Sequence, residues 1–399
     1  FMSGPLQGIR VLDIATILAA PLAGTLMADF GADVVKAELP GTGDGLRNFP
    51  PFKDGKSVWW KAANRNKNFI TLDLRRPEGA ELLLKMLPKF DVLLENFRTG
   101  TLAKWGLDKE TLWQANPNLI ILRATAFGQT GPYATKPGFA RIFEAMSGLA
   151  YITGDPDRSP MHNGYPIGDA IGGLTACNAV LMSLLGRERG TITGGEEIDL
   201  SLTEATFRLL DSMTIQYDQL GEEPQRTGNA SHYSAPANVF RTSDGQYVSL
   251  SGSTQATFVG NAKAIDRPDL LEDPKFDTNQ TRFANREEIN EIYTEWFDNH
   301  TQAEAIESFA RENGTLAPIY SVAQIFEDPQ FAAREAIVPV QDDDFGEVRL
   351  QAVVPKLSNN PGKVRHTARS LGADNMAVYE EYLDLSADEV AALQEKGII

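Results

Sequence analysis

Residues 9–38 read IRVLDIATILAAPLAGTLMADFGADVVKAE and contain the pattern of one strand–helix–strand unit. The apolar run Ile9–Ile14 predicts a strand, and Val34–Glu38 predicts a second one. Between them, Pro21–Phe30 predicts a helix that opens at its proline. Two strands joined by a crossover helix lie parallel in one sheet. The sequence therefore predicts an α/β protein.

The alternation of strands and helices continues beyond this unit. Further strands are predicted at 69–74, 91–95 and 119–123. A helix is predicted from 77 to about 87, and another helical stretch precedes the last of these strands. Such alternation indicates a mostly parallel sheet that is covered by helices on both faces. The segment after the first strand, 15–20, contains no glycine, so the GxGxxG turn of nicotinamide-binding sites is missing.

The composition changes in the second half of the chain. Residues 221–236 are polar and rich in turn-forming residues, and we place a domain boundary there. A second module follows, and it is expected to open with a hairpin around Ser243-Asp244-Gly245. The elements predicted beyond the boundary are hairpin strands at 237–241 and 246–251, helices at 286–299 and 302–313, a late strand at 348–354, and a terminal helix at 387–396 capped by Ser386.

Composition and charge exclude several classes of protein. The chain has 399 residues, of which 42% are hydrophobic and 23% charged, so it is a folded globular protein rather than a disordered one. Its formal charge of -17 argues against sequence-independent binding to nucleic acid or to an anionic membrane, since both need a basic surface. No signal peptide and no apolar run of about 20 residues is recognised. We therefore expect neither a nucleic-acid partner nor a membrane partner.

Cysteine and histidine are scarce. The single cysteine, Cys177, cannot form an intrachain disulfide, so a reducing compartment and a cytoplasmic location are expected. Apolar residues at helical spacing predict a packed helix over Leu174–Arg187, in which Cys177 is a small core residue rather than a nucleophile. The four histidines lie far apart and show no metal-ligand spacing. No metal is expected.

Gly168-Asp169-Ala170-Ile171-Gly172-Gly173 is the most unusual local sequence. Asp169 is either the N-cap of a helix that begins near Leu174 or a catalytic carboxylate, and spacing alone favours the cap. Basic residues at strand ends and in loops could bind phosphates, although most of them are expected to be solvated. These basic residues are Lys36, Arg75, Arg76, Arg98, Lys104, Lys136 and Arg141.

Several stretches, taken together, resemble the class III CoA-transferase family, also called the CaiB/BaiF family. Their order and spacing span the chain, and any one of them alone is a weak signal. The matching stretches are Pro5–Asp13, Ala20-Pro21, Gly31–Lys36, Leu72–Leu74, Glu95–Gly100, Ala145–Gly148, Gly168-Asp169 and Leu371–Asn375.

The resemblance implies that Asp169 is the nucleophile of an acyl-CoA:carboxylate CoA-transferase. Its carboxylate would attack the acyl-CoA thioester to form a mixed anhydride, and coenzyme A would then pass through an aspartyl thioester to the acceptor acid. The implied partners are an acyl-CoA donor and a small carboxylic-acid acceptor, with no permanently bound cofactor. The implied contacts of coenzyme A are Ile17, Leu18, Leu72, Arg75, Asn96, Phe97, Arg98, Lys104, Lys136 and Phe139, with Arg75 and Lys104 as phosphate partners.

The chain also departs from some members of the family that it resembles. Ile17-Leu18 stands where formyl-CoA transferases carry a glutamine, and Leu39 stands where some relatives have arginine. Related racemases have Gly-His-Asp where this chain has Gly138-Phe139-Ala140, and phenylalanine cannot exchange a proton. The transferase is therefore preferred over a 2-methylacyl-CoA racemase or isomerase. A non-catalytic CoA-binding paralogue is a further alternative.

The resemblance implies an architecture as well. A large Rossmann-like domain, 1–225, would bind coenzyme A and carry the nucleophile, and a smaller α+β domain would span 226–330. The C-terminal segment, 331–399, would return to the large domain. Two such chains would form an interlocked homodimer.

Overall fold

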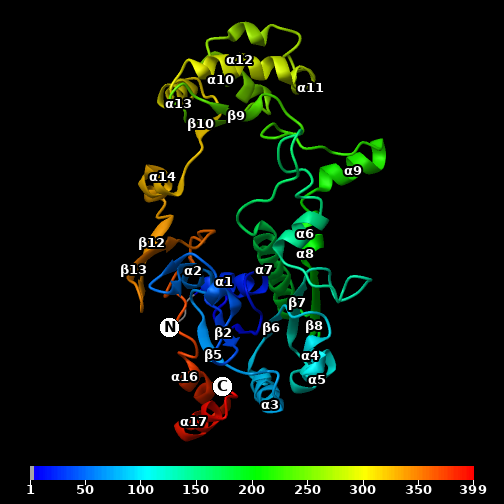
Figure 1. Cartoon of the computed structure of the whole chain (residues 1–399), viewed down its shortest axis with the longest axis vertical. Coiled ribbons are helices and arrows are strands. Elements are labelled where there is room, and N and C mark those ends of the chain that lie inside the picture. The colour runs from blue at the N-terminus through cyan, green and yellow to red at the C-terminus, as the bar shows by residue number, and fades with distance from the viewer. Residues whose placement is uncertain (1–3) are drawn as a thin grey trace. The chain divides into compact units, whose positions relative to one another are not determined.

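The computed structural model describes residues 4–399, which form two compact units (Figure 1). The large unit comprises 4–149, 162–219 and 332–399, and the second unit comprises 150–161 and 220–331. The domain limits expected from the sequence placed 150–161 and 220–225 in the large domain, whereas the structure places both segments in the second unit. The segment 150–161 lacks a helix or strand of its own, which left no pattern that could reveal its place.

The large unit is built on a six-stranded parallel sheet, which confirms the parallel α/β prediction. Its order is β5-β2-β1-β6-β7-β8, so the direction of winding reverses between β1 and β6. Numbered along the chain, this order is 3-2-1-4-5-6, as in doubly wound sheets. The strands are β1 (Arg10–Asp13), β2 (Asp33–Glu38), β5 (Asn68–Thr71), β6 (Val92–Glu95), β7 (Ile120–Thr125) and β8 (Glu196–Ser201).

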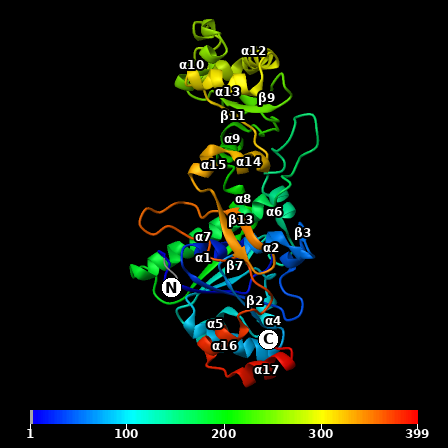
Figure 2. The same cartoon turned by 90° about the vertical axis from the view of Figure 1, so that its left-hand side faces the viewer.

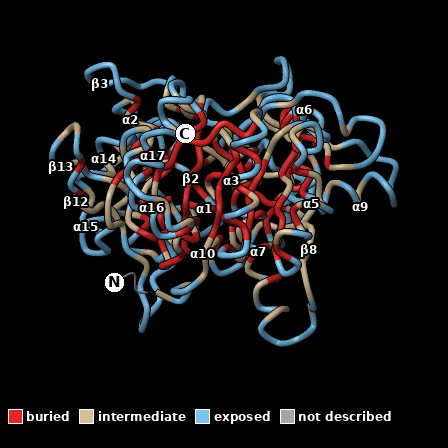
Figure 3. Tube along the Cα trace, turned by 90° about the horizontal axis from the view of Figure 1, so that it is seen from below, coloured by how far each residue is buried: buried red, intermediate tan, exposed pale blue. Residues whose placement is uncertain are grey.

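Helices cover both faces of this sheet because alternate strand residues are apolar on each side. Val11 packs with the helices of one face and Leu12 with those of the other, and the buried residues fill the middle of the unit (Figure 3). The helices that share a core with Val11 are α1 (Ala19–Asp29), α6 (Ala140–Met146), α7 (Ile167–Glu188) and α8 (Leu202–Phe207). Those that share a core with Leu12 are α3 (Pro77–Met86), α4 (Thr101–Lys104), α5 (Lys109–Ala115), α16 (Asn375–Leu383) and α17 (Ala387–Glu395).

Residues near the C-terminus cover the edge strand β5. The N–H of Phe69 donates to Asp374 Oδ2 at 2.8 Å, and that of Thr71 donates to Asn375 Oδ1 at 2.8 Å. The hydroxyl of Tyr379 donates to the Thr71 carbonyl at 2.7 Å. These bonds occupy backbone groups that an exposed edge would leave open to another chain. They attach the C-terminal segment to the large unit.

Shorter elements complete the large unit. The expected strand at 348–354 is observed as β13, which begins earlier and pairs with β12 in a hairpin. The expected terminal helix is observed with Ser386 as its cap. The shorter elements are β3 (Phe52–Lys53), β4 (Lys56–Ser57), α2 (Val58–Ala63), α4 (Thr101–Lys104), β12 (Ile337–Asp342), β13 (Gly346–Gln351), the 3-10 turns Gly45–Asn48 and Leu87–Lys89, and α9 (Asp211–Leu220), whose last residue belongs to the second unit.

The second unit contains a small antiparallel sheet with α10, α12 and α13 on one side (Figures 1 and 2). The predicted hairpin is confirmed as β9 and β10, and β11 adds a third strand. Aromatic side chains, including Phe240, Tyr293 and Phe297, fill the core between sheet and helices. The elements are β9 (Ala237–Arg241), β10 (Tyr247–Ser251), β11 (Leu316–Pro318), α10 (Gln255–Ala264), the 3-10 turn Pro268–Leu271, α11 (Asn279–Ala284), α12 (Arg286–Asp298), α13 (Gln302–Arg311) and α14 (Val322–Glu327), and α15 (Pro329–Ala333) crosses the limit between the units.

Helix α7 corrects two expectations. It begins at Ile167 rather than near Leu174, because the glycines that suggested a turn are instead points of close packing. A Cβ atom on Gly172 would lie 2.3 Å from the Leu202 side chain, and one on Gly173 would lie 2.8 Å from the Ala19 carbonyl oxygen. In length and composition α7 also satisfies the criteria for a membrane-spanning helix, although no apolar run of that length was expected. In the structure its buried face packs on α1 and α8.

Four charged residues are buried together at the ends of β1 and β2. Lys67 Nζ donates to Asp13 Oδ2 at 2.8 Å and to the Pro21 carbonyl at 2.7 Å. Lys36 Nζ lies 3.0 Å from Asp44 Oδ2 and 3.7 Å from Asp13 Oδ1. Two carboxylates thus balance two ammonium groups away from water. We call Asp13, Lys36, Asp44 and Lys67 the buried ion cluster.

The buried ion cluster holds the turn that follows β1. Lys36 Nζ donates to the Ala15 carbonyl, and the Ile17 N–H donates to Asp44 Oδ1 at 3.0 Å. Ile17 has a φ of 67°, a left-handed conformation that is strained for a β-branched residue. The bonds from Asp44 and Lys36 therefore supply the constraint that keeps this turn in place.

Asp44→Asn tests this constraint. Burial would raise the pKa of Asp44, but Lys36 and the Leu46 and Ile17 N–H groups outweigh burial and hold it below 3.8. The substitution leaves Lys36 with one carboxylate fewer, and breaking a buried pair costs about 3–5 kcal/mol of unfolding free energy. We expect this loss in denaturant unfolding at pH 7. It should shrink below about pH 4, where Asp44 of the unfolded chain takes up a proton, and disappear once the pH falls through the lower pKa of folded Asp44.

A matched control is Asp343→Asn, which changes an exposed carboxylate of the same unit. Its unfolding free energy should equal that of the wild type at both pH values. Equal stability of Asp44→Asn and Asp343→Asn at pH 7 would show that Asp44 does not constrain the fold.

Candidate active site

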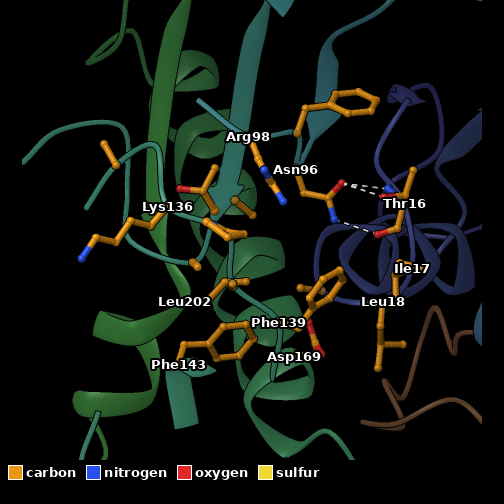
Figure 4. A pocket seen from close by; sticks show the side chains of 18 residues that line it. Thr16, Ile17, Leu18, Asn96, Arg98, Lys136, Phe139, Phe143, Asp169 and Leu202 are labelled. Carbon is orange, nitrogen blue, oxygen red and sulfur yellow. Dashed lines mark hydrogen bonds between the residues drawn. The ribbon is translucent and has the colours of Figure 1, made fainter. Parts of the chain in front are cut away.

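Two adjoining cavities lie where the winding of the sheet reverses. The first has a volume of about 230 Å³ and the second about 190 Å³, and Thr16 and Phe97 line both. The turn after β1 and the loop after β6 form their walls, and ligands of doubly wound sheets bind at this position. The first cavity is lined by residues 16–19, 96–98, 124–126, 134, 136–139, Phe143, Asp169 and Leu202 (Figure 4).

Asn96 joins the two walls. Its Oδ1 atom accepts the Thr16 N–H at 2.8 Å, and its Nδ2 atom donates to the Thr16 carbonyl at 2.7 Å (Figure 4). Asn96 was expected to contact coenzyme A, and it lines the first cavity. Its amide, however, already bonds the backbone of the neighbouring turn. The structure therefore gives Asn96 a role in holding Ile17 and Leu18 at the cavity wall.

Asp169 lies in the first turn of α7, where Pro166 is the N-cap. The expectation that Asp169 is itself the N-cap of a later helix is wrong, because the glycines after it are helical. Burial, and after it the negative charge of Glu144, raises the pKa of Asp169 to about 7. A carboxylate of this kind is poorly solvated and unusually basic, as functional groups in active sites often are.

Glu144 is a neighbour of Asp169 that the sequence did not reveal. It lies on α6 and is only 2% exposed. Its Oε1 atom accepts the Gly168 N–H at 2.9 Å, and its Oε2 atom lies 3.0 Å from His162 Nδ1. The only signal in the sequence was an acidic residue directly before the matched stretch Ala145–Gly148. Neither Glu144 nor His162 stood out by spacing.

The remaining walls of the first cavity are apolar with two cations. Leu18, Phe139 and Leu202 supply apolar surface near Asp169, and Arg98 points into the cavity (Figure 4). Lys136 also lines it, and its Nζ atom lies 3.8 Å from the centre of the Tyr133 ring. Figure 4 shows the Lys136 side chain pointing away from Asp169, so the cavity combines one basic carboxylate, the positive charge of Arg98 and an apolar wall.

The second cavity contains the other group of expected residues. Leu72 and Arg75 line it together with Phe97, and Leu39 is part of the same lining. The Arg75 guanidinium donates to both oxygens of Asp73 at 2.8 Å, and its side chain is 57% exposed. Asp73 thus directs Arg75 while leaving one side of it open to solvent.

Most of the expected site residues come together at these two cavities. Lys104, the last residue of α4, lines neither of them. Cys177 lies behind the site on α7, and burial raises its pKa to about 11, so its thiol is protonated near neutral pH. The expected residues that line the first cavity are Ile17, Leu18, Asn96, Phe97, Arg98, Lys136, Phe139 and Asp169, and those that line the second are Leu72, Arg75 and Phe97.

Comparison with known proteins gives one consistent result. The profile of CoA-transferase family III matches residues 6–375. The chain is 40% identical over 397 residues to the succinyl-CoA–D-citramalate CoA-transferase of Chloroflexus aurantiacus, covering 99% of this chain and 98% of that one. It is also 40% identical over 402 residues to the beta subunit of the succinyl-CoA–L-malate CoA-transferase of that organism, with 99% and 98% covered.

A solved structure agrees with these sequences. The crystal structure of a CaiB/BaiF family protein from Brucella suis superimposes with a TM-score of 0.83 and 33% identity, covering 95% of this chain and 100% of that one. The family profile and the relatives together span nearly the whole chain. The chain therefore belongs to CoA-transferase family III, the CaiB/BaiF family, and is a CoA-transferase that uses CoA thioesters as substrates.

Proposed function

We propose that this enzyme transfers coenzyme A from succinyl-CoA to a small dicarboxylate, with Asp169 as the covalent nucleophile. The observation that carries the proposal is the Asp169 carboxylate, raised to a pKa of about 7, in the cavity at the reversal of the sheet. The relatives named above act on succinyl-CoA with D-citramalate or L-malate, which are both dicarboxylates. Arg98 supplies positive charge to the same cavity, as negatively charged acyl groups require.

The reaction uses four acyl transfers on Asp169. Its Oδ atom attacks the thioester carbon of the donor and the C–S bond breaks. Coenzyme A departs as the thiolate, and Asp169 and the donor acyl group form a mixed anhydride. The thiolate then attacks the aspartyl carbon and releases the donor as a free carboxylate. The acceptor carboxylate attacks the resulting aspartyl thioester, and the thiolate leaves again. A final attack on the acceptor acyl carbon gives the new acyl-CoA and regenerates the Asp169 carboxylate.

The environment of Asp169 suits the first step. Poor solvation leaves little water to remove from the carboxylate before it attacks, and its raised pKa makes it more nucleophilic than an exposed aspartate. An ester formed by a hydroxyl nucleophile would be too stable to return coenzyme A. An aspartyl anhydride or thioester remains reactive toward a thiolate or a carboxylate.

An extended acyl-CoA would occupy both cavities. The thioester lies in the first cavity beside Asp169, and the nucleotide end extends to the second, past the shared walls Thr16 and Phe97. Arg75 would then bind a phosphate from the second cavity. Lys104, which lines neither cavity, stays a proposed phosphate partner on the strength of the family resemblance.

The proposal includes a Rossmann-like large domain and a cytoplasmic homodimer. The 3-2-1-4-5-6 strand order supports the first part. Exposed apolar side chains on α6 and α7 support the homodimer, because a second copy would cover them. These side chains are Ile142, Met146, Leu174, Met182 and Leu185.

Asp169→Asn tests the nucleophile. With succinyl-CoA and a panel of acceptors that includes malate, citramalate, glutarate and acetate, we expect wild-type transfer to the dicarboxylates, detected by product mass. The variant should lose at least about 10³-fold in kcat/KM. Its fold should persist. The raised pKa means that the ionised carboxylate is unfavourable in the folded state, and asparagine carries no charge that would have to be buried. Near wild-type transfer by Asp169→Asn would exclude this residue as the nucleophile.

The pH dependence offers an independent test of the ionised form. Only the carboxylate of Asp169 can attack, so kcat/KM for succinyl-CoA should fall about tenfold per pH unit below pH 7. An aspartate with an ordinary pKa of 3.8 would keep a plateau down to about pH 5. A rate profile between pH 5 and 9 distinguishes the two. A flat profile across this range would contradict the raised pKa of the nucleophile.

Arg75→Ala and Lys104→Ala test the phosphate contacts. A contact present in both ground and transition states affects binding rather than chemistry, so each variant should raise KM for succinyl-CoA with little change in kcat or in KM for the acceptor. Arg76→Ala is the matched control, since Arg76 donates to the Lys396 carbonyl and does not line the second cavity. Unchanged donor KM in Arg75→Ala or Lys104→Ala would remove that residue from the site.

A further inference from the structure

Both carboxylate oxygens of Glu144 are engaged beside Asp169. Oε1 accepts the Gly168 N–H at 2.9 Å, and Oε2 lies 3.0 Å from His162 Nδ1. Glu144 is 2% exposed, so its charge is removed from water. A buried carboxylate is tolerated only where bonds of this kind compensate it. The two bonds connect Glu144 to the segment that carries Asp169.

Gly168 is a point of close contact between α7 and α6. A Cβ atom at this position would lie 2.6 Å from the Phe143 ring and 3.0 Å from Glu144 Cγ. Its N–H belongs to the first turn of α7, where N–H groups have no partner within the helix. The N-cap residue, Pro166, gives α7 no side-chain cap. Glu144, from another helix, therefore accepts the N–H that lies one residue before Asp169.

His162 holds the other side of Glu144. It lies at the start of the segment that leads to α7, and its side chain is 22% exposed. Its bond to Oε2 leaves Oε1 facing the Gly168 N–H. Without this partner, the Glu144 carboxylate could rotate away from Gly168. The two hydrogen bonds therefore connect His162 through Glu144 to Gly168, the residue before Asp169.

We propose that Glu144 and His162 are positioning residues for the nucleophile, Glu144 by fixing the first turn of α7 and His162 by holding the Glu144 carboxylate in place. This inference rests on the proposed role of Asp169. Neither residue touches the reacting atoms. Their effect is exerted through the orientation of one turn and through the charge of Glu144.

The charge of Glu144 gives the inference a measurable signature. It is the charged group that raises the pKa of Asp169 in addition to burial. Tyr165 also lies close, since Asp169 contributes to raising its pKa after burial. Arg98 and Lys136 line the cavity into which Asp169 opens. Among these neighbours, Glu144 bonds the turn through its side chain, and Tyr165 bonds it through its backbone carbonyl, which accepts the Ile167 N–H at 2.8 Å.

Five variants test the inference. Glu144→Gln keeps the size and an acceptor oxygen but removes the charge, so the acid limb of kcat/KM should move to lower pH. Glu144→Ala removes the acceptor, and the misplaced nucleophile should lower kcat by up to about 100-fold with KM for succinyl-CoA nearly unchanged. His162→Ala should lower kcat in the same way, and His162→Gln, whose amide can donate to Oε2, should restore most of it. Glu188→Gln, at the exposed far end of α7, should match the wild type.

The outcomes separate this inference from the proposed function. Hydroxylamine with succinyl-CoA should inactivate the wild type and leave a hydroxamate on Asp169. If the wild type turns over without this label, the nucleophile is wrong. If the label forms, two results would overturn the inference: an acid limb in Glu144→Gln equal to that of Glu188→Gln, or wild-type kcat in His162→Ala. Glu144→Gln is isosteric, so it still reports if Glu144→Ala does not fold.

Discussion

The pairing of Asp13 and Asp44 with Lys36 and Lys67, away from water, is the constraint on which the site depends. Removing the carboxylates or the ammonium groups would leave uncompensated charges in the core, so the cluster keeps its geometry. That geometry extends to the turn after β1 through the Ile17 N–H and the Ala15 carbonyl. It holds a β-branched residue in a left-handed conformation where dinucleotide-binding folds use glycine. A strained turn of this kind is maintained because it forms the wall of the cavity.

Close helix packing supplies the other half of the site. Gly172 and Gly173 allow α7 to lie directly against α1 and Leu202, and this contact brings the first turn of α7 to the ends of the strands. Asp169 is thereby buried from one side and opens into the first cavity on the other. The same burial raises its pKa and makes it a stronger nucleophile. Packing and reactivity at Asp169 therefore have one origin.

The sequence predicted what depends on local pattern. The alternation of 9–38 correctly indicated parallel strands and a crossover helix, and Ser386 correctly indicated a capped helix. It failed where one pattern has two physical meanings: glycines around Asp169 suggested a turn but serve helix packing. Glu144, His162 and Asp44 could not be found, because each acts through a contact that exists only after folding. Lys104 was named from resemblance, and it lines neither cavity, so its role stays a prediction.

The central claim is that Asp169 carries the transferred group covalently. The most direct measurement mixes the enzyme with succinyl-CoA in the absence of acceptor, quenches with acid within one turnover, and maps the peptides by mass. The account predicts coenzyme A, attached as a thioester, or succinate, attached as an anhydride, on the peptide that contains residue 169, and release of either by added dicarboxylate. An active enzyme whose residue-169 peptide stays unmodified, or which carries the adduct on another acid such as Glu144 or Asp155, would contradict it.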